Sequence, residues 1–440
     1  MGAWSDSSGY PAVVSFHEGR LVFARTKREP QTMWMSVVEG YNQFIPTERD
    51  GLVTDDLAVT ITLSSREVNA IEWIEAQKIM IVGTSGGEWL IEPASGSSEP
   101  ITPSNVKASQ QSQIGSYRGG SVSLVTGNSL VFIHREGNKL LEMSYNFELE
   151  AWQPMDISAH ADDLFDGTSG AIQKIILQKG KDNIVWIKNA DGGLIGMTYE
   201  RDPAVVAFWR VYPATQSTDA FWENYDMTAV SIPSENKNDL YMAAFCPEIQ
   251  KYGILRLTDG NHLDYNVTAT PSGGVVTGVN ALYTDGSTVT IQQTDTQHLV
   301  WNDTISDIDL TGLGAVDITY GLPFDSEVRV PPMEGGSYYG TSIGKVKRTP
   351  KLNIGLVGEL LEAYMPAFGF YEFTNTPDDT TDSDEFVYES VIYSNLASGF
   401  FTDEIWLKSD YGASTQFGMK SIRARPLTVV YIAPQQHVNE

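Results

Sequence analysis

The densest group of potential metal ligands is an acidic stretch in the C-terminal part of the chain, made up of Asp378, Asp379, Asp382, Asp384 and Glu385. Clustered carboxylates are ligands that Ca²⁺ favours in proteins. The stretch lacks the glycine and the bidentate-glutamate spacing of an EF-hand loop, and short runs of like charge usually form solvated loops. We therefore predict no metal site in this stretch and no cofactor for the chain.

The other residue types with catalytic potential are dispersed. The single cysteine, Cys246, excludes an intrachain disulfide and lies in an apolar run, where a thiol is usually a small buried hydrophobe. The glycines of residues 83–87 open a strand rather than a helix, so they predict a hairpin turn and not a phosphate-binding loop. No metal-ligand spacing relates any two of the six histidines, which are His17, His134, His160, His262, His298 and His437.

These observations predict a protein without catalytic residues, that is, not an enzyme. No nucleophile elbow, Walker loop or dinucleotide fingerprint occurs in the sequence. A glycosidase needs two carboxylates in one pocket, and a sequence alone cannot place them there. A hydrolase therefore remains an alternative, although the arginines are scattered.

The chain has 440 residues and a net charge of −27, from 29 Lys and Arg against 56 Asp and Glu. A protein that binds nucleic acid normally has a net positive charge, because lysine and arginine neutralise the phosphates. The acidity indicates either solubility or a wall that repels DNA. We find no secretion signal in residues 1–9 and no run near the about 18 apolar residues of a membrane span. We therefore expect synthesis in the cytoplasm and no membrane insertion.

A weak internal repeat organises the chain. Each unit reads as an apolar strand, a tight turn, a second apolar strand, another turn and a third strand, and the first turns recur about every 50–60 residues. Such spacing, with sheets that are apolar on both faces, predicts the blades of a β-propeller, and a pair of β-sandwiches is the alternative. The units begin at residues 12, 70, 121, 171 and 227.

A second, smaller β-domain is expected after the repeats. We predict a propeller-like repeat domain over residues 1–334, a Gly/Ser/Tyr-rich linker over 335–344, and a C-terminal β-domain over 345–440. The C-terminal strands are expected at 351–357, 386–393, 404–408 and 428–432, with one short helix near 359–365. The predicted fold class is therefore all-β, with repeated antiparallel sheets and a second β-domain.

The first 45 residues resemble those of a known family. Trp4, the Gly9-Tyr10-Pro11 segment, His17, Arg20 and the Pro30-Gln31-Thr32 segment occur in an order that is similar to the tail nozzle proteins of short-tailed bacteriophages, also called tail tubular protein B. The basic turn at residues 345–348 and the closing residues 425–429 resemble the same family more weakly.

The resemblance implies a structural virion protein without catalytic residues. The expected protein is a homo-hexamer in the viral tail, made in the host cytoplasm, below the portal and adaptor and beside fibre or spike proteins. It would conduct duplex DNA during genome ejection without specific binding, and an acidic wall would prevent sticking. The family's usual N-terminal region is expected to be missing or separate. Candidate DNA-facing acids are Glu359, Asp378, Asp379, Asp382, Asp384 and Glu385.

The alternative function is a receptor- or carbohydrate-binding propeller at the tail tip. This alternative rests on aromatic side chains that we expect to be exposed and that suit stacking on a ligand. They are Tyr338, Tyr339, Phe368, Phe370 and Tyr371.

Overall fold

The computed structural model describes residues 4–76, 79–95, 99–118, 122–126, 129–148, 150–159, 161–165, 170–180, 183–200, 205–211, 223–246 and 251–257, and strand segments between residues 264 and 438. Within these residues the chain is built of β-strands and one short 3-10 helix, Asp162–Leu164. In this part of the chain, no helix has the length and apolar character needed to span a bilayer. The predicted all-β fold class is confirmed.

The chain divides into two compact units. The first contains Met1–Val211, Glu223–Phe245 and Tyr252–Leu257, and the second contains Tyr212–Trp222, Cys246–Lys251 and Thr258–Glu440. The domain limits that the sequence suggests, with a linker at 335–344, stay a prediction.

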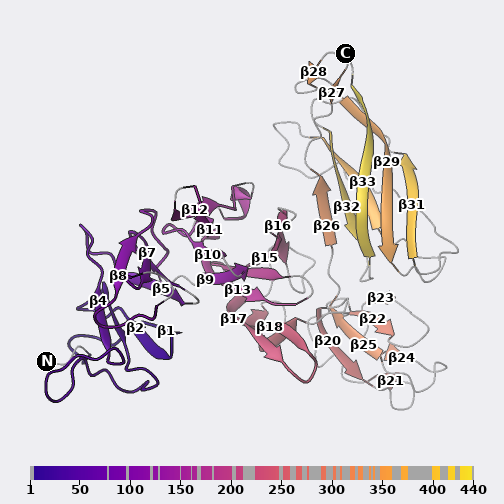
Figure 1. The fold of residues 1–440 in the computed structure, drawn as a ribbon. Helices are drawn as coiled ribbons and strands as arrows, with labels where there is room; N and C mark the ends of the chain where they lie inside the picture. Colours follow the sequence, from indigo (N-terminus) through magenta and orange to yellow (C-terminus); the bar gives the residue numbers. More distant parts are fainter. Residues whose placement is uncertain are drawn as a thin grey trace. The chain divides into compact units, whose positions relative to one another are not determined.

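The first unit contains a series of antiparallel meanders, in which strands that are neighbours in sequence pair in order (Figure 1). Sheet A contains β1 (Val13–His17), β2 (Arg20–Ala24), β3 (Thr32–Met35) and β4 (Val59–Thr62). Sheet B contains β5 (Ile71–Ala76), β6 (Met80–Thr84), β7 (Gly87–Glu92) and β8 (Lys107–Gln110). Sheet C contains β9 (Val122–Thr126), β10 (Ser129–Ile133), β11 (Leu140–Asn146) and β12 (Ala151–Asp156).

Two further meanders complete this series. Sheet D contains β13 (Ile172–Gln178), β14 (Ile184–Asn189), β15 (Leu194–Glu200) and β16 (Val205–Val211). Sheet E has three strands among the described residues, β17 (Glu223–Ile232), β18 (Lys237–Cys246) and β19 (Lys251–Leu257). All five sheets match repeat units that the sequence predicts, and sheets A to D each add a fourth strand.

The turns show why these strands form hairpins. His17 on β1 pairs with Arg20 on β2, so the connecting loop has only Glu18 and Gly19. Both loop residues have positive φ, 48° and 71°. Two-residue hairpin loops require this backbone conformation because it matches the right-handed twist of the strands.

Successive sheets pack face to face through apolar side chains. One core joins sheets A and B, another joins B and C, a third joins C and D, and a fourth joins D and E. The first strands of successive sheets lie beside each other, β1 with β5, β9 with β13, and β13 with β17. Sheets stacked in this way, each with its first strand on the same side, form a β-propeller-like fold.

Two tryptophans lie across glycines on neighbouring strands. Gly83 on β6 pairs with Trp73 on β5, and Gly196 on β15 pairs with Trp209 on β16. A Cβ atom at Gly196 would lie 2.3 Å from Cε2 of Trp209, and one at Gly83 would lie 2.1 Å from Cε2 of Trp73. The glycines therefore leave the space that the indole rings occupy.

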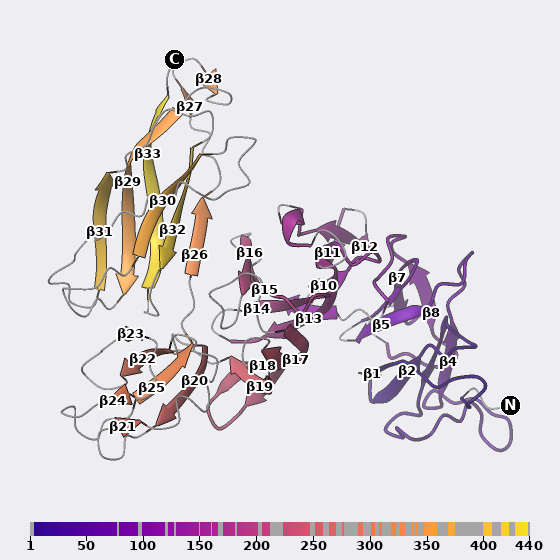
Figure 2. The same ribbon diagram turned by 180° about the vertical axis from the view of Figure 1, so that it is seen from behind.

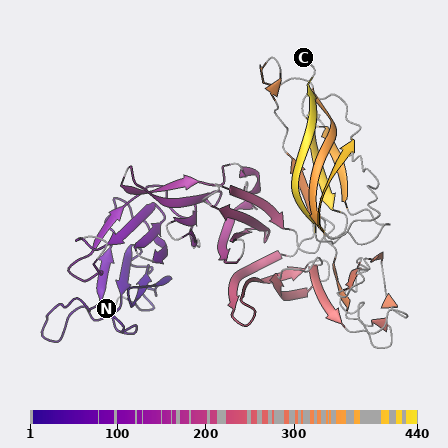
Figure 3. The ribbon, with the colours of Figure 1, turned by 45° about the vertical axis from the view of Figure 1, so that its right-hand side comes forward.

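The described residues of the second unit also lie in strands. Its longest described strands lie together in one sheet, with β29 (Lys347–Gly358) between β31 (Gly399–Trp406) and β33 (Leu427–Val438) (Figures 2 and 3). These strands match the predictions at 351–357, 404–408 and 428–432. The strand predicted at 386–393 and the helix predicted near 359–365 lie outside the described residues.

The remaining described strands of this unit form smaller sheets. They are β20 (Asp264–Ala269), β21 (Val275–Val276), β22 (Val289–Gln293), β23 (Trp301–Asp303), β24 (Ile308–Asp309), β25 (Ile318–Leu322), β26 (Ser326–Val330), β27 (Gly336–Ser337), β28 (Gly340–Thr341), β30 (Phe368–Thr374) and β32 (Thr415–Ser421).

Candidate functional site

A polar group lies where sheets D and E meet, at one end of their apolar core. Lys174 on β13 pairs directly with Lys188 on β14. Side chains alternate between the faces of a strand, and Trp186, two residues before Lys188, belongs to the core shared with sheet E. Both lysines therefore lie on the face of sheet D that is turned to sheet E.

Lys174 is held by a carboxylate of the neighbouring sheet. Its Nζ atom lies 2.6 Å from Oδ1 of Asp226 on β17. This hydrogen bond lowers the pKa of Asp226, although burial acts in the opposite direction. The pair connects the first strands of sheets D and E, and both side chains are partly exposed to solvent.

Lys188 is different because the residue is buried and its ammonium group has only a neutral partner among the described residues. The residue is 7% exposed, and its Nζ atom donates a hydrogen bond to Oε1 of Gln173. In the described part of the chain no carboxylate forms an ion pair with it. Burial lowers the pKa of Lys188, Asp226 and Asp191 act against this shift, and Lys174 adds to it.

Asn224 on β17 supplies an unsatisfied amide next to this group. It is 4% exposed, and neither its Nδ2 nor its Oδ1 atom has a hydrogen-bond partner among the described residues. Asn224 pairs with Ala244 on β18. Ala244 and Met242 are both buried on the face of sheet E that packs against sheet D. Because paired residues point to the same face, the amide is turned to sheet D.

The β14–β15 turn, which follows Lys188, is held in place by two hydrogen bonds. Its backbone is held by a bond from Gly193 N to Oδ1 of Asp191, 2.9 Å long, and Gly192 has a φ of 88°. The amide nitrogen of Asn224 donates to the carbonyl of Gly192 over 3.1 Å. Sheet E is thus tied to the turn by its backbone, while the Asn224 side chain is left without a partner in the described residues. We call Gln173, Lys174, Lys188, Asn224 and Asp226 the lysine–amide cluster.

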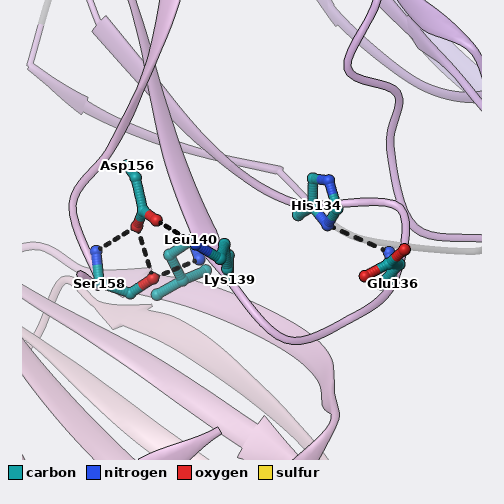
Figure 4. Close-up of polar contacts among 6 residues, drawn as sticks. All are labelled: His134, Glu136, Lys139, Leu140, Asp156 and Ser158. Carbon is teal, nitrogen blue, oxygen red and sulfur yellow. Dashed lines mark hydrogen bonds and ion pairs between the residues drawn. The ribbon is translucent and has the colours of Figure 1, made fainter. Parts of the chain in front are cut away.

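A second lysine–aspartate group in sheet C shows what a fully partnered site looks like (Figure 4). Asp156 accepts hydrogen bonds from Nζ of Lys139 at 2.9 Å and from N and Oγ of Ser158 at 2.9 and 2.8 Å. Burial acts to raise the pKa of Asp156, but these bonds outweigh burial and lower it. Lys188 differs from Lys139, because no carboxylate among the described residues contacts its ammonium group.

Other buried charges stabilise the sheets. The guanidinium of Arg20 is 1% exposed and donates to the carbonyls of Ser36, Asp55 and Leu57 at 2.7, 2.7 and 2.6 Å. Arg25 of sheet A forms an ion pair with Glu72 of sheet B. These contacts tie both guanidinium groups to protein atoms.

The sequence-predicted acidic residues give no site that can be described. Glu359, Asp378, Asp379, Asp382, Asp384 and Glu385 all lie outside the described residues, as do Tyr338 and Tyr339. Within the residues that the structure does describe, no three His, Cys, Asp or Glu side chains form a group that could hold a metal ion.

The lysine–amide cluster was missed by sequence reasoning. Its members are ordinary residue types spread over three strands, and only the pairing of β13 with β14 and the packing of sheet E bring them together. Lys188, which directly follows the apolar run 184–187, was the one available signal, because buried strands rarely end on a buried charge.

Comparisons with known proteins give no family. No protein-family model and no curated protein matches the chain. An auxiliary nutrient binding protein from Bacteroides thetaiotaomicron is 12% identical with a TM-score of 0.33, and the match covers 57% of each chain. The chain thus spans little more than half the length of that protein.

Two sugar-acid lactonases are also similar in fold. The periplasmic gluconolactonase of Pseudomonas aeruginosa is 12% identical over 57% of this chain and 70% of its own, with a TM-score of 0.32. A putative 6-phosphogluconolactonase from Bacteroides fragilis is 11% identical over 56% of this chain and 70% of its own, with a TM-score of 0.30. Such identities show the fold alone, and the fold places the chain in the class of β-propeller-like proteins.

Two predictions are corrected by these comparisons. The matched structures are lactonases and a nutrient-binding protein rather than tail tubes, and they contradict the predicted DNA conduit. The same matches contradict the prediction that the chain is not an enzyme, but they assign no reaction to it. The nozzle-family resemblance, the hexamer, its partners and the virion location stay predictions.

The structure supplies a physical reason for the correction. The residues that carry the resemblance stabilise sheet A: Trp4 packs edge-on against Phe23 and Trp34, and Arg20 binds backbone carbonyls. These residues therefore have packing and hydrogen-bonding roles within sheet A. Such packing roles do not by themselves define what the whole protein does, because one fold hosts many functions.

Proposed function

We propose that this chain is a binding protein for a small, hydroxyl-rich molecule, which it holds at the lysine–amide cluster. The observation that carries the proposal is Asn224, whose amide nitrogen and oxygen both lack a partner although the residue is 4% exposed. An unsatisfied buried polar group costs about 1–3 kcal/mol, so a protein that retains one usually uses it.

Hydroxyl groups fit the chemistry of this cluster. An alcohol both donates and accepts hydrogen bonds, and so does the amide of Asn224. Lys188 offers donors, and Asp226 and Gln173 offer acceptors, on neighbouring strands. A molecule with several hydroxyls could therefore satisfy both kinds of group at once.

The position in the fold supports the same proposal. Lys174 lies on β13 and Asn224 and Asp226 lie on β17, which are the adjacent first strands of sheets D and E. The first strands surround the axis of a propeller, and ligand sites form where several elements converge.

The test is calorimetric titration of the full chain with a panel of small polyols, sugars and sugar acids. We expect saturable binding of at least one member, and we expect Asn224→Leu to weaken it at least about tenfold, as expected when a buried hydrogen-bonding group is lost. Asn238→Leu is the matched control, because Asn238 is on the same sheet and also has an unpartnered amide oxygen, but it lies on β18 opposite Ser231, near the β17–β18 turn. Binding that Asn224→Leu leaves unchanged would contradict the proposal.

A further inference from the structure

We infer that the ligand of the lysine–amide cluster is an anion, a polyhydroxylated carboxylic acid whose carboxylate binds Lys188. The inference rests on the proposed function and names the class of ligand. Its starting point is the unequal pairing of two lysines that lie opposite each other.

The charges of the cluster leave one positive charge without a contact partner. Lys174 is neutralised by Asp226 at 2.6 Å. Asp191, the other nearby carboxylate, acts on Lys188 only through space, since its Oδ1 atom accepts the backbone N–H of Gly193. A buried ammonium is costly unless a negative charge pairs with it. One unpaired ammonium matches the single charge of a carboxylate better than the double charge of a phosphate ester.

The present partner of Lys188 can be exchanged for a ligand. Gln173 holds the ammonium through its neutral amide oxygen, and the Gln173 residue is exposed to solvent. A carboxylate that replaces it makes a charge-assisted hydrogen bond, which is roughly twice as strong as a neutral one. The released amide of Gln173 returns to water, so the exchange leaves no new buried group unsatisfied.

The hydroxyls of the same ligand account for the other open partners. The amide of Asn224 is turned to sheet D near the β14–β15 turn that follows Lys188, and it lacks partners for both of its polar atoms among the described residues. A carboxylate bound to Lys188 would bring the adjacent hydroxyl-bearing carbons toward that amide. Carboxylate and hydroxyls on one short chain therefore fit the cluster together.

The experiment compares gluconate with sorbitol, its uncharged polyol counterpart, in titrations of the full chain and its variants. We expect gluconate to bind at least about tenfold more tightly than sorbitol, because charge-assisted bonds are the stronger ones. Lys188→Met should remove that preference. Lys139→Met in sheet C is the control, because the partner of Lys139 is Asp156, and it should leave the preference intact.

A second variant changes affinity in the opposite direction. Asp226→Asn removes a carboxylate that competes for the two lysines, so the preference for gluconate over sorbitol should rise by roughly threefold to tenfold. This outcome does not depend on whether Lys188→Met folds. Sugar phosphates serve as a further arm, and tighter binding of a phosphate than of gluconate would overturn the carboxylate assignment.

The outcomes separate the two proposals. If gluconate and sorbitol bind with equal affinity, and neither Lys188→Met nor Asp226→Asn changes those affinities, the anion inference is overturned and the proposed function still holds. Binding of neither compound, nor of any other member of the panel, would overturn both.

Discussion

Lys174 and Lys188 face each other across β13 and β14, but only Lys174 contacts a carboxylate. Like charges directly opposite on a sheet repel each other, and a buried ammonium with a neutral partner adds a desolvation cost. The folded protein therefore carries a local destabilisation at this site. Such a cost at a defined place is typical of binding and catalytic sites, where stability is given up for function.

Replacing Lys188 by methionine should make the unliganded protein more stable. Methionine keeps the unbranched stem and removes the buried charge, so the repulsion from Lys174 also disappears. We expect a gain of about 1 kcal/mol or more, which is about 2–4 °C in melting temperature for a unit of this size. Differential scanning calorimetry without ligand measures it. A lower melting temperature would show that the ammonium of Lys188 stabilises the fold.

Glu88 on β7 should make stability depend on pH in the acidic range. It is fully buried, and burial raises its pKa, although the hydroxyls of Ser112 and Ser116 donate hydrogen bonds that oppose the shift. Because the folded protein holds the proton of Glu88 more tightly than the unfolded chain, this residue stabilises the folded state most at low pH. The stabilisation is fully present below the pKa of the unfolded chain, about 4.3, and it is lost as the pH rises through the pKa of the folded protein. Each unit of difference corresponds to about 1.4 kcal/mol.

The measurement is urea unfolding at a series of pH values for the natural chain and for Glu88→Gln. The glutamine variant should lose this part of the pH dependence and gain relative stability toward neutral pH. Glu92→Gln, a change on the same strand, controls for the substitution itself. Parallel pH profiles for the natural chain and Glu88→Gln would rule out a buried, proton-linked carboxyl.

Arg20 should be essential to sheet A. Its guanidinium donates to three backbone carbonyls at 2.6–2.7 Å, which the single ammonium of lysine cannot reproduce with the same planar geometry. Because each such charge-assisted bond contributes about 1.5–3 kcal/mol, Arg20→Lys should destabilise the protein by at least about 3 kcal/mol in chemical denaturation. Lys107→Met, which breaks the exposed pair with Glu92, should cost no more than about 1 kcal/mol. Equal effects of the two changes would contradict this assignment.

Gly196 and Trp209 should be energetically coupled. A methyl group at Gly196 would lie 2.3 Å from the indole, so Gly196→Ala should cost about 1–3 kcal/mol through overpacking. In a Trp209→Ala background the same change should cost far less, because the obstructing ring is gone. A double-mutant cycle measures this coupling, and additive effects of the two changes would show that the ring does not lie over the glycine.

Much of the fold could be predicted from the sequence, since hairpin turns leave local signals. Glu18 and Gly19 form the expected two-residue loop, and the five repeat units correspond to sheets A to E. The fourth strands of the sheets, such as β12 with Trp152 and β16 with Trp209, were not part of the predicted units.

The candidate site could not be predicted in this way. Lys174, Lys188 and Asn224 become neighbours only through the stacking of two sheets, and no local pattern encodes that contact. The opposite error arose at residues 4–45, where a distinctive motif suggested a function. Its residues proved to be the aromatic and arginine contacts of sheet A.

The most direct test of the account is a crystal structure of the chain grown with saturating gluconate. We predict that the ligand lies between β13, β14 and β17, with a carboxylate oxygen in hydrogen-bond distance of Nζ of Lys188 and a hydroxyl in hydrogen-bond distance of the Asn224 amide. A structure in which the Asn224 amide bonds to protein atoms, or in which gluconate binds elsewhere, would contradict the claim that the lysine–amide cluster is a ligand site.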